Sequence, residues 1–221
     1  MGIKYIAFGL ILALSSVARA QLGGKSFEAN GFIGMHRMNP SALNNYIDEF
    51  NGLGGTTTQV GNINSGSTAY GEAIFYLGES LALGARYSIN GHIVDGKRSN
   101  VKTEVGAVMA DISAVLKYLS PPEKFQFGVG VTAGIAYPFG VVVDDGVTKV
   151  AYGAENVPVG RFFITGRFNF GRFALFGEGG YMHVKAAELK NGSLTLSRSD
   201  GTKVDLDLSG TYLGVGMGFQ F

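Results

Sequence analysis

The sequence predicts an all-β protein, an eight-stranded antiparallel up-and-down barrel, and three observations carry this prediction. Apolar side chains alternate with small or polar ones in about eight segments of roughly ten residues each. Short connectors between these segments alternate with long polar ones. Glycine is abundant at 35 residues, aromatic residues make up 12% of the chain, and charged residues only 16%. This composition suits a transmembrane β-barrel whose wall faces lipid and whose narrow interior must hold side chains.

The first twenty residues are interpreted as a secretory signal peptide rather than as part of the fold. Lys4 gives a basic start, residues 5–14 form an apolar run, and residues 18–20 match a small-x-small cleavage site. The apolar run is about half as long as the roughly 20 residues that a membrane-spanning helix needs. We therefore expect residues 1–20 to be removed and residues 21–221 to form one domain.

Composition also excludes several classes of function. The chain contains no cysteine, which rules out a disulfide framework, thiol catalysis and thiolate metal sites. Its formal net charge is +1, so it lacks the basic surplus that accompanies nucleic-acid binding. No nucleic-acid partner is therefore expected.

Each of the first four segments carries an apolar set on one face and a polar or small set on the other. In the first segment, Ala29 and Ile33 face outward, whereas Glu28, Asn30 and Phe32 face inward. The same period of two recurs in the next three segments. The four segments are 27–35, 69–77, 81–89 and 104–118.

The last four segments decide which face meets the lipid. In the final segment Leu213, Val215 and Met217 alternate with small or polar residues, so that one face is uniformly apolar. In the seventh, the opposite phase would place Glu178 in hydrocarbon, and Leu175 must therefore point outward. The four segments are 125–137, 160–168, 172–183 and 211–221.

The connectors predict a barrel with short turns at one rim and long loops at the other. The short turns are 78–80, 119–124 and 169–171, and the long loops are 37–66, 90–103, 138–159 and 184–204. The first long loop contains a predicted short helix at 41–51, which Asn39 or Ser41 can cap and whose first turn suits Pro40. This helix either rests on the barrel mouth or enters the lumen. Its apolar face consists of Leu43, Tyr46, Ile47 and Phe50.

Seven charged residues are predicted to point into the lumen and form a charge network. They are Glu72, Arg86, Asp111, Lys117, Arg161, Arg167 and Glu178. Glu72 and Arg86 are equidistant from the turn between their segments, so we expect them to pair directly. Arg161 is expected diagonal to Glu178 and within reach of it. We favour a network of ions that satisfy one another. The alternative is a charge-lined constriction for a small solute. Inward glycines would lend it space unless this is filled by the rings of Phe32, Tyr76, Phe163, Phe176 and Tyr212.

No catalytic residue, cofactor or metal site is predicted. The three histidines, His36, His92 and His183, are not at metal-ligand spacing, and His183 is expected at the rim. Gly214, Gly216 and Gly218 lack the strand-then-helix context of a nucleotide-binding loop.

Outward aromatic residues near the segment ends favour a membrane barrel with aromatic belts at both interfaces. A soluble β-sandwich is the alternative, although an apolar face on nearly every strand fits it poorly. The belt residues are Tyr87, Tyr118, Tyr137, Phe168, Phe173, Tyr181 and Phe221.

The chain resembles a known group at its end. Gly214, Met217, Phe219 and Phe221 look like the C-terminal strand signal of bacterial outer-membrane proteins, which ends in phenylalanine and is read by the barrel assembly machinery. The whole pattern is similar to the small eight-stranded barrels of the OmpA, OmpX and OmpW kind. This resemblance implies a location in the outer membrane, with outer-membrane lipid, lipopolysaccharide and the assembly machinery as partners.

Three functions remain open, because members of this group differ in what they do. We favour a structural or surface-interaction protein whose extracellular loops bind a ligand. A narrow porin-like conduit for small or hydrophobic solutes is the second hypothesis. A lipid-modifying enzyme is the third, and we expect no enzyme, because lipid A deacylases of similar size have a serine two residues from the histidine, whereas His183 is followed by Val184 and Lys185.

Overall fold

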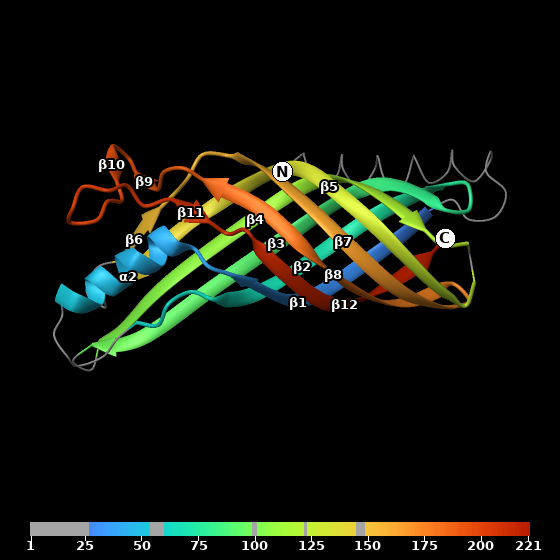
Figure 1. The fold of residues 1–221 in the computed structure, drawn as a ribbon, viewed down its shortest axis with the longest axis horizontal. Helices are drawn as coiled ribbons and strands as arrows, with labels where there is room; N and C mark the ends of the chain where they lie inside the picture. Colours follow the sequence, from blue (N-terminus) through green and yellow to red (C-terminus); the bar gives the residue numbers. More distant parts are fainter. Residues whose placement is uncertain (1–26, 54–59, 99–100, 122, 145–148) are drawn as a thin grey trace, which may run out of the picture.

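A computed structural model describes residues 27–53, 60–98, 101–121, 123–144 and 149–221. The predicted signal peptide at 1–20 lies outside this range. Within it, eight long antiparallel strands close into a barrel, with β12 pairing β8 on one side and β1 on the other (Figure 1). The strands of the ring are β1 (Phe27–Met38), β2 (Ser65–Leu77), β3 (Leu81–Arg98), β4 (Val101–Leu119), β5 (Phe125–Asp144), β7 (Val157–Phe170), β8 (Phe173–Ala186) and β12 (Gly210–Gln220).

The wall has the phase that the sequence predicts. Ile33, Phe127 and Leu213 are exposed to 69%, 65% and 71%, whereas Glu28 and Glu178 are buried. Because each of the eight ring strands pairs with a neighbour on both sides, its backbone polar groups find partners without water, which is the condition for crossing a bilayer with strands. The fold class is confirmed, and the closed ring replaces the soluble sandwich alternative. No helix in the described part of the chain is long and apolar enough to cross a membrane.

Several predicted loops are in part strands. The prediction of a loop at 90–103 is wrong, because β3 and β4 stay paired up to Arg98 and Val101. The predicted loop 138–159 is wrong at its start, because β5 runs on to Asp144 and pairs there with β6 (Lys149–Tyr152). It is also wrong at its end, because β7 begins at Val157. Beyond the apolar band, the strand ends continue to pair, since pairing satisfies their backbone N–H and C=O groups there too. Loop 184–204 contains the last residues of β8 and two short strands, β9 (Lys190–Asn191) and β10 (Leu194–Thr195); β11 (Leu206–Asp207) follows it and pairs β8.

The short turns match the predicted rim, with one change of position. The β7–β8 turn lies at Gly171 and Arg172, with Phe170 opposite Phe173, rather than at 169–171. Gly171 has φ +66°, a left-handed conformation that glycine adopts readily. This placement moves the register of β8 against β7, which matters for the lumen contacts.

A helix, α2 (Ser41–Leu53), lies at the long-loop end of the barrel, as Figure 1 shows. Leu43 and Ile47 are fully buried on the predicted apolar face. Asn44 accepts a hydrogen bond from the N–H of Ile63 and donates one to its carbonyl, at 2.8 and 3.1 Å. Asn51 makes the same pair with Val60, at 2.9 Å each. The returning segment is thereby held along α2. Leu43 and Ile47 share a buried cluster with Val105 and Val159 of the barrel strands, so the helix packs on the barrel mouth.

Candidate functional site: the barrel interior

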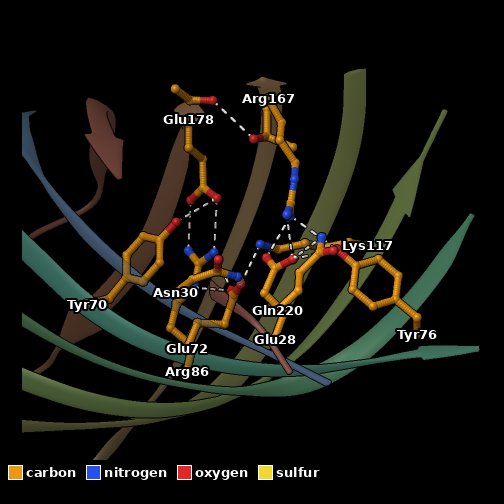
Figure 2. Close-up of polar contacts among 12 residues, drawn as sticks. Glu28, Asn30, Tyr70, Glu72, Tyr76, Arg86, Lys117, Arg167, Glu178 and Gln220 are labelled. Carbon is orange, nitrogen blue, oxygen red and sulfur yellow. Dashed lines mark hydrogen bonds and ion pairs between the residues drawn. The ribbon is translucent and has the colours of Figure 1, made fainter. Parts of the chain in front are cut away.

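The centre of the lumen is built around Arg86 on β3. Its Nε and Nη2 atoms donate to Glu72 Oε2 at 3.0 and 2.7 Å. On the other side, Nη1 and Nη2 donate to the two carboxylate oxygens of Glu178 at 2.8 and 3.0 Å. Arg86 lies opposite Glu72 in the β2–β3 register, and all three side chains are completely buried. One guanidinium thus bridges β2 and β8 across the lumen (Figure 2).

Polar neighbours complete this central cluster. Lys117 on β4 forms a second ion pair with Glu72. Asn30 donates to Glu72 at 3.0 Å. The hydroxyls of Tyr70 and Tyr212 donate to Glu178 at 2.8 and 2.9 Å. Both carboxylates therefore have several donors, which is what a buried carboxylate requires.

A second cluster lies nearer the short-turn rim. Arg167 binds both oxygens of Glu28, with Nη1 to Oε1 at 2.6 Å. Tyr76 and Gln220 each donate to Glu28 Oε2 at 3.0 Å. Glu28 is absent from the predicted charge network. The signal for it was available, since alternation places it on the inward face of its segment.

A third cluster corrects one predicted contact. Arg161 binds Asp111 through two hydrogen bonds of 2.8 and 2.5 Å, and Ser113 donates to Asp111 at 2.9 Å. The expected contact of Arg161 with Glu178 is wrong, because Arg161 lies opposite Met182, while Thr165 lies opposite Glu178. The physical reason is the displaced β7–β8 turn, which carries Arg161 along the barrel axis and away from Glu178.

The ions of the lumen balance. Among the described residues, the three clusters contain four carboxylates and four cations, and each carboxylate contacts at least one cation. All seven residues predicted to line the lumen are buried. The formal charges of these eight side chains therefore sum to zero, and each buried ion has the oppositely charged partner that burial requires.

Aromatic rings occupy the space that the inward glycines leave. A Cβ atom added to Gly216 would overlap the ring of Phe176, and one on Gly130 would overlap the ring of Phe163. Tyr70 stacks on Phe32 with ring centroids 4.5 Å apart. The guanidinium carbon of Arg86 lies 3.7 Å from the centroid of the Tyr70 ring. At these two positions the missing glycine side chains therefore leave room for large rings.

Of the three histidines, one lies at the long-loop rim and two lie inside the barrel. His183 is exposed near the end of β8, and its Nδ1 lies 3.1 Å from the hydroxyl of Ser209. That contact could not be read from spacing, because the two residues are 26 apart in sequence. The Ser209 hydroxyl also bonds the N–H and carbonyl of Val184, at 3.1 and 3.2 Å, so it ties two chain segments together. His36 and His92 are buried inside, and no three His, Asp or Glu side chains of the described residues cluster as metal ligands.

Comparison with known proteins supports the fold. No protein-family model and no curated protein matches the sequence. Several solved structures are similar in fold, and two of them have TM-scores above 0.5. The outer membrane protein OprG from Pseudomonas aeruginosa has a TM-score of 0.56 and 12% identity, over 90% of this chain and 98% of that one. Neisserial surface protein A has a TM-score of 0.51 and 11% identity, over 90% and 99%. With its apolar wall, closed ring of antiparallel strands and asymmetric rims, the chain has the fold of the small eight-stranded β-barrels of the bacterial outer membrane.

Proposed function

We propose that this outer-membrane barrel is a rigid carrier for its long loops, which form a surface for interaction with an extracellular ligand. The observation that carries the proposal is the filled interior, in which balanced ions and aromatic rings occupy the lumen and α2 covers its mouth. A conduit needs a continuous passage, and a filled lumen supplies none. At the long-loop end, by contrast, the described residues include α2 and the short strands β6, β9, β10 and β11 in addition to the ring strands.

Ion pairs hold that loop end together. Glu49 on α2 accepts a hydrogen bond from the Ser199 N–H at 2.8 Å and contacts Arg198 at 3.4 Å. Glu188 contacts Lys190 at 2.8 Å and pairs with Lys203. Hydrogen bonds from these two lysines lower the pKa of Glu188 to about 2, and it stays ionised at neutral pH. The helix and the β9–β10 region therefore form a joined platform that can present a fixed surface.

An antibody-accessibility experiment tests which rim faces the outside. A short epitope inserted after Gly192, at the exposed β9–β10 turn, is expected to bind antibody on intact cells. The same epitope after Gly171, at the short-turn rim, is expected to bind only after the outer membrane is permeabilised. The measurement is flow cytometry on the two strains. Binding to the Gly171 insertion alone on intact cells would invert the proposed topology.

A planar-bilayer recording tests the conduit alternative. Purified wild-type protein is expected to give no discrete conductance steps under conditions in which a general porin does. In an Ile47→Glu variant, the cost of burying a carboxylate between α2 and the barrel is expected to displace the helix from the mouth. This variant is expected to give no conductance steps either, because the ions and rings of the lumen remain in place. Reproducible steps from the wild type would sink the closed-lumen proposal. Steps from the variant alone would assign closure to α2.

A further inference from the structure

Two buried histidines form a group that the three ion clusters leave unused. His36 points inward from β1 and His92 from β3, with relative exposures of 1% and 0%. Their ring centroids are 5.4 Å apart, and the ring planes meet at 57°. Gly66 on the intervening strand lies opposite His36, and a Cβ atom there would overlap His92 Nδ1. The absence of a side chain at position 66 is thus what lets the two imidazoles approach each other across β2.

Neither imidazole is satisfied by the protein. Within the described part of the chain, none of the four ring nitrogens has a hydrogen-bond partner. Buried polar atoms are nearly always bonded, and in this lumen the neighbouring carboxylates each have several donors. The backbone of Gly210 lies beside His36 and that of Ser65 beside His92. Among the described residues neither contact reaches hydrogen-bond geometry, so the four ring nitrogens stay available as ligands.

The spacing of the rings fits one shared ion. With metal–nitrogen bonds of about 2.0–2.1 Å, two imidazoles on one tetrahedral ion have ring centres about 5 Å apart. Imidazole is a favoured ligand for zinc, copper and nickel. Asn90 Nδ2 and Ser88 Oγ, on the same inward face of β3, are also without partners among the described residues, and they make this part of the lumen polar enough to hold water.

The nearby charges do not oppose a cation. Arg161 acts electrostatically on His36, but its charge is compensated by the two hydrogen bonds to Asp111. The ion would therefore enter a region that is close to neutral. No thiolate competes for it, because the chain contains no cysteine.

We propose that His36 and His92 together bind one imidazole-preferring transition-metal ion inside the upper lumen, with water completing its coordination shell. The sequence offered little signal for this site, because the two residues are far apart in the chain and only the barrel register brings them together. Such an ion would pin β1 to β3 directly beneath the covered mouth.

Copper is the sharpest probe, since Cu²⁺ binds imidazole most strongly of the divalent first-row ions and reports its ligands by electron paramagnetic resonance. The barrel is produced without a polyhistidine tag, and a chelator removes bound metal. The protein is then refolded in detergent, with Cu²⁺ added before folding in one sample and after folding in another. After gel filtration, the wild type is expected to retain about one ion per chain with hyperfine coupling to two nitrogens. Zinc, measured by elemental analysis, is expected to occupy the same site.

Matched variants separate this site from the rim. His183→Ala, which removes the exposed histidine, is expected to keep the ion and its spectrum. We expect copper retention no higher than a detergent blank for His36→Ala, for His92→Ala and for the double variant. The same result is expected for His92→Gln, whose side chain is close in volume to histidine. Each variant is used only if its gel mobility still changes on boiling, which reports an intact barrel. Copper retained by a folded double variant, or absent from the wild type, would overturn the proposal.

Discussion

Replacing Arg86 with methionine is expected to destabilise the barrel by about 3–5 kcal/mol, because it leaves a buried carboxylate without a cation. In this variant Glu178 loses its ion pair with Arg86, whereas Glu72 still pairs with Lys117. The chain contains no tryptophan, so unfolding is best followed in urea by the fraction of folded barrel on an unheated gel. A shift of the urea midpoint at unchanged slope reports the loss of stability.

Two further variants decide whether charge is the cause. Arg172→Met removes an exposed arginine at the β7–β8 turn and is expected to leave the midpoint near that of the wild type. Adding Glu178→Gln to Arg86→Met is expected to recover part of the lost stability, because the uncompensated charge disappears. If the double variant were less stable than Arg86→Met alone, packing rather than charge pairing would be the main contribution of this arginine.

Placing valine at Gly214 is expected to cost about 3 kcal/mol, at the upper end of overpacking effects, because the new side chain meets backbone rather than movable atoms. Gly214 lies opposite Gly34 where β12 closes against β1. A Cβ atom at position 214 would overlap the Ile33 carbonyl oxygen and crowd the Gly34 Cα atom. The strands can accommodate it only by separating at the seam. The measurement is again the urea midpoint of the refolded barrel.

Gly31 supplies the matched control on the same seam. A Cβ atom there has nothing within 4 Å, and the position faces outward. Gly31→Val is therefore expected to fold as well as the wild type, and the added apolar surface meets lipid. Equal midpoints for the valine variants at positions 31 and 214 would show that the seam tolerates inward volume, contrary to the close approach described above.

The wall of the barrel was predictable because its chemistry repeats locally. Every second residue must suit hydrocarbon, so a single misplaced ion such as Glu178 decides the phase of a whole strand. The face of α2 that carries Leu43 and Ile47 was predictable for the same reason, since a helical period is also local. Strand ends were harder to predict, because the polar ends of β3 and β4 pair above the apolar band with no change in their own alternation.

The interior contacts depend on register, which the sequence specifies only through the turns. A turn placed at Gly171 and Arg172 gives Arg161 a different partner from the one expected of a turn at 169–171. Asn44 and Asn51 resemble ordinary polar residues of a helix until the returning segment brings Ile63 and Val60 beside them. The pair of His36 and His92 likewise exists only once β2 lies between their strands.

The contacts of Glu28 have a consequence for how the chain assembles. Its partners Arg167 and Gln220 are 139 and 192 residues further along, on β7 and on the final strand. An early fragment of the polypeptide lacks both partners, and an unfinished barrel would leave this carboxylate at an open edge without them. Membrane insertion and closure of the barrel are therefore expected to occur together, because β12, the last strand, supplies a hydrogen bond that Glu28 on the first strand lacks until then.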